Sequence, residues 1–149
     1  MGRRGATELQ DVSSGFRGAA HSLAIGKVLL AATHAERWPD YLCRSRLEVF
    51  TDATIDTPGH LYTELAKVRE RGYATDVEEY AARVCCVAAP VYDSAGRVLA
   101  AVGISVPPRR FEREFDRLVH AVKASARDTS EMFSGLDPLT ALVRRTAEA

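Results

Sequence analysis

The most regular pattern of hydrophobic and polar positions lies between Thr57 and Gly72. Its apolar side chains recur at the spacing of one helix face: Leu61, Leu65 and Val68. Thr57 is a residue type that caps helix N-termini, and Pro58 fits the first turn, where its missing N–H costs little. Gly72 readily adopts the left-handed conformation at which helices end. The pattern predicts a helix that begins after Thr57 and ends at Gly72.

Apolar positions with helical spacing predict three more helices. A helix over residues 24–32 follows Ser22, which we expect to cap it. A short helix is expected over residues 36–43, and a long amphipathic helix over residues 109–133. The buried side of the long helix is expected to carry Phe111, Phe115, Leu118, Val122 and Met132.

Three segments rich in β-branched and small residues predict strands over residues 73–79, 84–92 and 97–106. Residues 93–96, Asp-Ser-Ala-Gly, have the composition of a turn, so the last two strands should form an antiparallel hairpin. Prolines at positions 107 and 108 end the sheet. The order of elements predicts the α/β (α+β) class, with an antiparallel sheet of about three strands packed with helices.

The two faces of the hairpin differ, because side chains alternate along a strand. One face of the last strand is bulky and typical of a core: Val98, Ala100, Val102, Ile104 and Val106. The other face carries Gly103 and Ser105 near the strand end. An even number of loop residues puts Cys86 on the same side as these two, and Cys85 on the opposite side. This side is either a pocket floor or the seat of a closely packed helix, and the pattern leaves both interpretations open.

The start of the helix over residues 24–32 is a second candidate site. The first N–H groups of a helix have no partner within it and attract carboxylates or phosphates. Gly26 keeps the backbone open to close approach, and Lys27 adds positive charge. This Gly-Lys pair is not a Walker loop, because the upstream glycines of that motif are absent.

Three acidic residues follow the helix end at Gly72: Asp76, Glu78 and Glu79. One interpretation makes them a solvated strand edge. The other makes one of them a polar group that orients a bound ligand.

Composition narrows the class of function. The chain has 149 residues, of which 46% are hydrophobic and 27% charged, and this fits one globular domain. Its 20 basic residues match its 20 acidic residues, so we expect no DNA contact by this chain alone. No apolar run reaches the roughly 18 residues of a membrane span, and the N-terminus lacks the apolar stretch of a secretion signal. A cytoplasmic location without membrane contact is therefore expected.

The cysteines and histidines argue against two kinds of site. Three cysteines without a secretion signal do not suggest a disulfide framework. No Cys-x-x-Cys or His-x-x-x-His spacing occurs, so we expect no metal and no cofactor. A thiol enzyme would need a base near Cys86, for which His21 is the candidate. We keep that enzyme as a remote alternative and expect no catalytic activity.

Several segments follow one another in a characteristic order. The first is HSLAIGKVLLA at residues 21–31, and the second is KVRERGYA at 67–74 with the acidic residues that follow. The remaining segments are CVAAPVYD (86–93), GRV (96–98), AAV (100–102), IS (104–105) and Pro107. Taken in this order, the segments resemble the effector-binding domain of IclR-type bacterial transcription regulators, most strongly between residues 86 and 107. The resemblance covers roughly residues 15–133. We therefore place a domain at 15–135, between a loose leader at 1–14 and a short C-terminal helix or tail at 136–149.

The resemblance implies a GAF-like domain that binds a small organic effector, commonly a carboxylic or aromatic acid. The effector-binding residues that it implies are Ala24, Ile25, Gly26, Asp76, Cys86, Gly103 and Ser105. In this comparison the amides of Ala24 and Ile25 hold the effector carboxylate, and Ser105 matches the second of two pocket serines. Gly103 stands where the first serine is common, so one hydrogen-bond donor is missing. Val106 replaces a frequent glycine.

Two more positions carry over from the resemblance. Asp76 matches the acidic position of the pocket, and Cys86 matches the pocket cysteine. The resemblance thus makes Cys86 and Ser105 the inward pair of the hairpin, with the helix start at Ala24 and Ile25 as the opposite wall of the pocket.

The resemblance also implies partners. In the family the domain follows a winged helix-turn-helix and contributes to dimer or tetramer assembly, so we expect a homo-oligomer. This sequence shows neither the winged helix nor the first strands of the domain. We therefore expect an N-terminally incomplete domain with an exposed strand edge, which favours pairing with another subunit.

The expected function is effector sensing that controls DNA binding allosterically in full-length relatives. The alternative is an interaction module that assembles with full-length regulators without sensing a ligand.

Overall fold

The structure is a computed structural model that describes residues 16–44 and 46–135. The elements follow in the order η1 (Phe16–Ser22), α1 (Ala24–Ala32), η2 (Ala35–Arg37), α2 (Trp38–Arg44), α3 (Pro58–Arg71), β1 (Ala74–Val77), β2 (Cys85–Tyr92), β3 (Val98–Val106) and α4 (Pro108–Gly135). The η elements are short 3₁₀ helices. The leader expected at residues 1–14 and the helix or tail expected at 136–149 lie outside the described residues.

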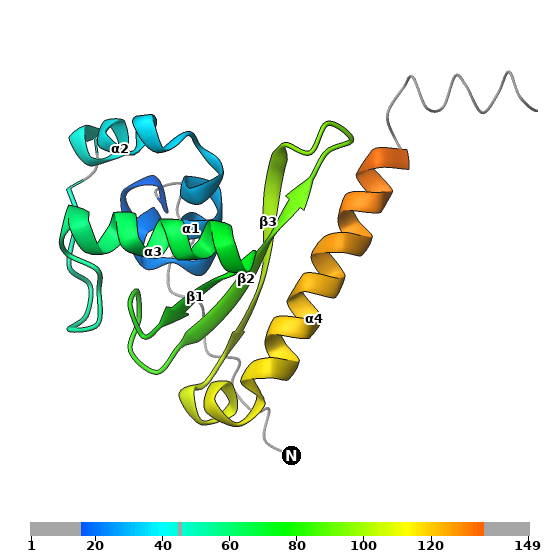
Figure 1. Cartoon of the computed structure of the whole chain (residues 1–149). Coiled ribbons are helices and arrows are strands. Elements are labelled where there is room, and N and C mark those ends of the chain that lie inside the picture. The colour runs from blue at the N-terminus through cyan, green and yellow to red at the C-terminus, as the bar shows by residue number, and fades with distance from the viewer. Residues whose placement is uncertain (1–15, 45, 136–149) are drawn as a thin grey trace, which may run out of the picture.

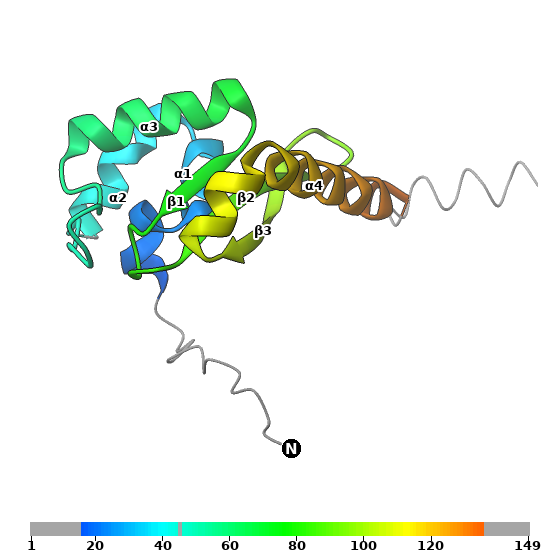
Figure 2. The same cartoon turned by 90° about the horizontal axis from the view of Figure 1, so that it is seen from below.

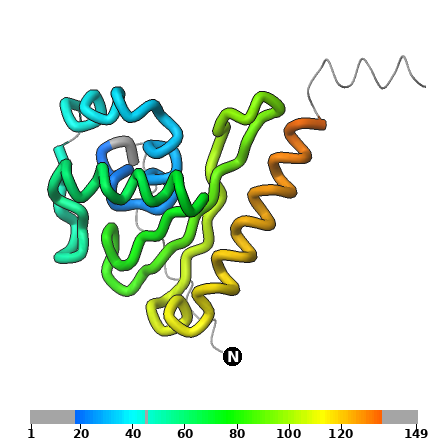
Figure 3. The backbone as a smooth tube through the Cα atoms, in the orientation of Figure 1, coloured from blue at the N-terminus to red at the C-terminus, as the bar shows by residue number. Residues whose placement is uncertain are grey.

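The three predicted strands form one antiparallel sheet in the order β1-β2-β3. The central strand β2 pairs with both neighbours, and the long hairpin of β2 and β3 is evident from the chain path in Figure 3. Cys86 of β2 lies opposite Asp76 of β1 and opposite Ser105 of β3. These three residues therefore share one face of the sheet, because directly opposed residues point to the same side.

Helices cover both faces of the sheet (Figure 1; Figure 2). The long helix α4 packs on one face, and α1 with α3 packs on the other. The core under α4 contains alternate residues of β2 and one side of the helix: Cys85, Val87, Ala89, Val91, Phe111, Leu118, Val122 and Ala126. The core on the other face joins Ala88 of β2 to α1 and α3, through Ala24, Val28, Ala31, Leu61, Leu65 and Val68.

The predicted buried side of α4 is confirmed for most of its length but is wrong at Met132, which is 70% exposed. Ser130 lies toward the sheet, where its hydroxyl accepts a hydrogen bond from the Tyr92 N–H. Met132 follows Ser130 by two residues, which corresponds to a rotation of about 200° around the helix axis. Met132 therefore points away from the sheet.

The helix predicted from Thr57 to Gly72 is present with both of its expected ends. The Thr57 hydroxyl accepts a hydrogen bond from the His60 N–H, and Pro58 is the first helical residue. Gly72 has φ 76°, and its N–H donates to the Val68 carbonyl. Local signals at the two ends are thus sufficient to define α3.

The segment predicted as a helix over residues 36–43 is a 3₁₀ turn followed by α2. Trp38 joins it to the rest of the protein, because its indole N–H donates to the Leu30 carbonyl of α1 at 2.9 Å. The same ring stacks on Tyr62 of α3 and lies under the Arg69 guanidinium. These contacts hold α2 beside α1.

Candidate functional site

A cavity of about 1400 Å³ lies between α1, α2 and the α1-facing side of the hairpin. Ligand pockets commonly have volumes of roughly 300–1,000 Å³, so there is room for a small organic molecule. Six of the seven residues that the sequence suggested for effector binding line this cavity: Ala24, Ile25, Gly26, Cys86, Gly103 and Ser105. The remaining residue, Asp76, lies outside the lining.

Cys86 and Ser105 form the polar part of the cavity floor. Their Sγ and Oγ atoms lie 3.0 Å apart across the β2–β3 ladder. The hairpin loop between the paired residues Tyr92 and Val98 has an odd number of residues, so the even loop assumed from sequence is wrong. A register shift between Val91 and Tyr92 offsets this, because one extra residue in β3 restores the parity. Cys86 therefore faces the same side as Ser105, as predicted.

The two glycines of the site are explained by packing. A Cβ on Gly103 would lie 3.2 Å from the Val87 carbonyl oxygen and 3.3 Å from Ile25 Cγ1. A Cβ on Gly26 would lie 2.3 Å from the Ala20 carbonyl oxygen. Gly26 thus allows η1 to cross α1, and Gly103 receives a side chain of α1. Both interpretations of the small-residue face therefore apply. Gly103 packs closely against a helix, and Cys86 and Ser105 line a cavity.

The first turn of α1 is open to the cavity. The first hydrogen bond of the helix runs from the Lys27 N–H to the Leu23 carbonyl, so the amides of residues 24–26 precede it. The N-cap is Leu23, which has no side-chain cap. The prediction that Ser22 caps this helix is wrong, because its hydroxyl donates backwards to the Ala19 carbonyl at 2.8 Å. No side chain thus caps the start of α1.

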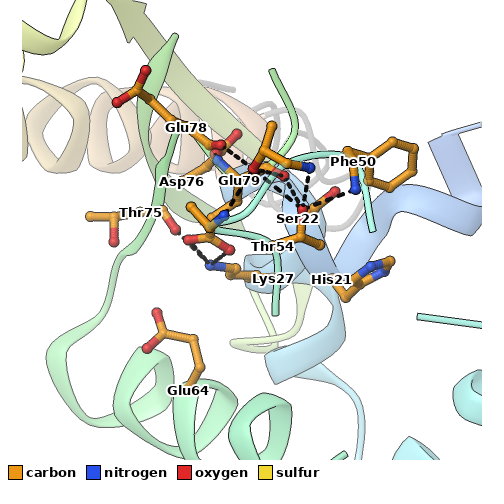
Figure 4. Close-up of polar contacts among 12 residues, drawn as sticks. His21, Ser22, Lys27, Phe50, Thr54, Glu64, Thr75, Asp76, Glu78 and Glu79 are labelled. Carbon is orange, nitrogen blue, oxygen red and sulfur yellow. Dashed lines mark hydrogen bonds and ion pairs between the residues drawn. The ribbon is translucent and has the colours of Figure 1, made fainter. Parts of the chain in front are cut away.

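Lys27 does not add charge to this opening. Its Nζ points away into the protein, where it lies 2.6 Å from each carboxylate oxygen of Glu79 and donates to the Thr75 carbonyl at 2.9 Å (Figure 4). The Lys27 side chain is 1% exposed. Its charge is therefore matched inside the protein, and the expectation from sequence is wrong for this residue.

Asp76 and Glu79 are buried, so the interpretation as a solvated strand edge is wrong for both. Asp76 Oδ1 accepts a hydrogen bond from the Glu79 N–H at 2.8 Å (Figure 4). Burial raises the pKa of the Asp76 carboxyl, and it also raises the pKa of Glu79, against the opposing effect of Lys27. Asp76 thus belongs to a buried polar cluster with Lys27 and Glu79.

Two threonines bind the segment directly after β1, which carries Glu79. Thr54 Oγ1 donates to the Glu79 carbonyl, and Thr51 Oγ1 donates to the Glu78 carbonyl, both at 2.6 Å. The Thr54 hydroxyl also accepts the Phe50 N–H (Figure 4). The segment after α2 is thereby tied to the end of β1.

A buried histidine joins the segment before α1 to one wall of the cavity. His21 is 0% exposed, and its Nε2 donates to the Glu48 carbonyl at 3.0 Å. That bond leaves Nδ1 to accept from the Tyr41 hydroxyl at 2.9 Å. Burial lowers the pKa of His21 below 6.5, which favours this neutral form. Tyr41 and Glu48 line the cavity, so His21 holds its outer wall in place.

The Cys86 thiol is poorly suited to nucleophilic chemistry. Burial raises the pKa of Cys86 above 9.0, which keeps it protonated at neutral pH. No cluster of three or more metal-ligating side chains occurs within the described residues. In the same part of the chain, no helix is both long enough and apolar enough to span a membrane.

The family of this chain follows from a match to the family model described as bacterial transcriptional regulator IclR, C-terminal, which covers residues 7–131. The chain belongs to this family. Among curated relatives of this IclR-type domain, the HTH-type transcriptional regulator BhcR of Paracoccus denitrificans is 38% identical over 117 residues. That alignment covers 78% of this chain and 42% of BhcR. The chain thus spans about two fifths of this curated relative.

Solved structures of IclR-type domains have the same fold. The C-terminal domain of the Escherichia coli regulator KdgR is 35% identical, with a TM-score of 0.72 over 77% of this chain and 71% of that chain. The PobR inducer-binding domain from Acinetobacter, a double mutant in complex with 3-hydroxybenzoic acid, is 25% identical. Its TM-score is 0.70 over 74% of this chain and 65% of that chain. The GAF-like architecture expected from sequence is therefore confirmed.

Sequence reasoning missed several residues of this IclR-type domain. Tyr41 and the arginines around α2 line the cavity, but the helix predicted over residues 36–43 carried no signal that related it to a site. Leu29 lies one turn after Ile25 on α1, and both are more than two fifths exposed. Their i, i+4 spacing was the one available signal for an apolar stripe facing the cavity.

Proposed function

We propose that this chain is a small-molecule effector-binding and oligomerisation domain of an IclR-type transcription regulator. The observation that carries the proposal is the convergence of Ala24, Ile25, Cys86 and Ser105 on one cavity. These residues come from the start of one helix and from two strands, so only the folded chain brings them together. The proposed location is the cytoplasm.

The proposed effector is a small organic acid with an apolar or aromatic body. Its carboxylate binds at the open first turn of α1, where the amides of Ala24 and Ile25 act as donors. The Ser105 hydroxyl orients the ligand together with the Cys86 thiol, and the exposed side of Leu29 contacts the apolar body. The 3-hydroxybenzoic acid complex of the PobR domain supports this class of ligand.

Asp76 has an indirect role in this proposal. It is paired with Cys86 across β1 and β2, and its carboxylate binds the Glu79 N–H. We infer that Asp76 holds the strand end behind Cys86 and fixes the position of the cavity floor. Gly26 acts in the same way at the other wall, because it lets η1 pack against α1.

Effector binding would act through assembly. In full-length relatives, a shift in the arrangement of subunits would reposition the DNA-binding domains, while this chain itself makes no DNA contact. The proposed assembly is a homo-oligomer, either a dimer or a tetramer.

A thermal-shift screen with small organic acids tests the sensing function. A ligand at 100 times its Kd stabilises a protein by about 2.7 kcal/mol, so a true effector should raise Tm by several degrees. The Cys86→Trp variant fills the cavity floor and should lose the shift. The Cys43→Trp variant changes an exposed cysteine outside the lining and should retain it. A screen in which no acid stabilises the wild type selectively over Cys86→Trp would count decisively against sensing.

A second candidate function, an interaction module, is favoured by β3. This edge strand, Val98–Val106, contains no charged residue and no proline, which are the usual protections of a free edge. The opposite edge strand, β1, is only four residues long. Light scattering after size exclusion tests the idea, and a strict monomer at high concentration would remove it.

A further inference from the structure

The wall of the cavity that faces α1 carries three arginines. Arg37, Arg44 and Arg46 come from η2, from the end of α2 and from the segment after it. Two carboxylates, Asp40 and Glu48, are on the same wall. Arg37 Nε lies 4.0 Å from Asp40 Oδ2, and both side chains are largely exposed, so these two charges offset each other only weakly.

Arg44 and Arg46 are the available cations of the cavity. Neither makes an ion pair or a side-chain hydrogen bond with any other residue in the described parts of the chain. Lys27 is not available to a ligand, because Glu79 already neutralises it. The charges of Arg37 and Asp40 cancel in the count for this wall. Glu48 then cancels one of the two remaining arginines, so the wall has a net positive charge.

The hydrogen bonds of His21 hold this wall at the open end of α1. His21 precedes Ala24 by three residues, and it bonds to the Tyr41 hydroxyl and to the Glu48 carbonyl. Residues 41–44 and 46–48, which include both arginines, are thereby held beside the first turn of the helix. On the cavity floor, Gly103 offers no side-chain donor.

We propose that Arg44 and Arg46 recognise the anionic group of the effector and make the site selective for organic anions over neutral molecules of the same shape. The inference rests on the proposed function, since it concerns the ligand of that cavity. A guanidinium group can donate two parallel hydrogen bonds to a carboxylate, which gives both charge and orientation. The arginines thus add the charge that the α1 amides and the Ser105 hydroxyl lack.

The test compares acids with their primary amides by calorimetry: benzoate, 3-hydroxybenzoate and pentanoate against benzamide, 3-hydroxybenzamide and pentanamide. We expect the wild type to bind at least one acid about tenfold or more tightly than its amide, because a hydrogen bond to a charged group contributes about 1.5–3 kcal/mol. The Arg44→Gln/Arg46→Gln variant should reduce this preference to about twofold or less. The control Arg109→Gln/Arg117→Gln removes the same charge from exposed positions of α4, across the sheet, and should keep the preference.

The outcomes separate the two proposals. If the double variant keeps the tenfold preference, or if the wild type binds acid and amide alike, the role of Arg44 and Arg46 is overturned while effector binding stands. If no probe of either kind binds the wild type, the proposed function fails and the inference fails with it. All substituted positions are exposed, and matching Tm values for the variants confirm that folding is unchanged.

Discussion

The Lys27 ammonium and the Glu79 carboxylate form an ion pair inside the protein, with Nζ 2.6 Å from both carboxylate oxygens. The pair joins the middle of α1 to the end of β1. The contact therefore helps to fix the position of α1. Because the first turn of α1 lines the cavity, the contact also helps to fix the shape of the cavity.

Replacing Lys27 with Met should lower the free energy of unfolding by about 3–5 kcal/mol, because Glu79 would remain buried without a counter-charge. Urea denaturation measures the change. The matched control is Arg37→Met, which breaks an exposed pair and should cost less than about 1 kcal/mol. The Lys27→Met/Glu79→Gln variant should recover part of the loss, and equal costs for Lys27→Met and Arg37→Met would contradict the prediction.

Substitution of Gly26 by Ala should destabilise the protein by about 3 kcal/mol, at the upper end of overpacking effects. The added Cβ would meet the backbone of Ala20, which cannot rotate away. Gly59 of α3 has open space around it, so Gly59→Ala should stabilise the protein by up to about 1 kcal/mol through helix propensity. Thermal unfolding of both variants checks the pair, and similar Tm values would show that η1 does not pack closely on α1.

The stability contributed by neutral His21 should be full above pH 6.5 and should decrease as the pH falls below that value. The reason is that burial lowers the pKa of His21 in the folded state, so the unfolded chain takes up a proton first. Asp76 and Glu79 act in the opposite direction, because their pKa values are raised and their contribution is lost as the pH rises.

The difference between wild type and His21→Gln isolates the histidine. Urea denaturation between pH 7.5 and about pH 5.5 should show a smaller loss of stability in the variant than in the wild type. Identical slopes for wild type and His21→Gln would rule out a buried neutral His21.

The three cysteines should differ in reactivity toward iodoacetamide. At neutral pH the exposed Cys43 should react first, Cys86 slowly, and Cys85 only after unfolding. The reason for Cys86 is that burial raises its pKa above 9.0 and reduces the thiolate fraction. Mass spectrometry of timed samples gives the order. Modification of Cys86 as fast as Cys43 would instead favour a nucleophilic thiol.

Local sequence signals determined several individual elements of the fold, including some that do not line the cavity. The Thr57, Pro58 and Gly72 signals act within a few residues, so both ends of α3 were predictable. Alternation along β3 likewise predicted that Ser105 faces away from the core under α4. The resemblance to the IclR family then indicated six residues that line the cavity, but it also included Asp76, which does not line it, and it missed Leu29 and the outer wall.

Only the tertiary structure decided how the charges are distributed. Lys27 and Glu79 are 52 residues apart, and no local pattern indicates that they meet. The same holds for His21, which forms hydrogen bonds with Tyr41 and Glu48, 20 and 27 residues further along the chain. Such contacts depend on how α1 packs between α2, α3 and the sheet. A buried polar group without a partner costs free energy, so each one pairs with a group that the packing places within reach. Lys27 therefore pairs with Glu79 inside the protein, whereas Arg44 and Arg46 line the cavity.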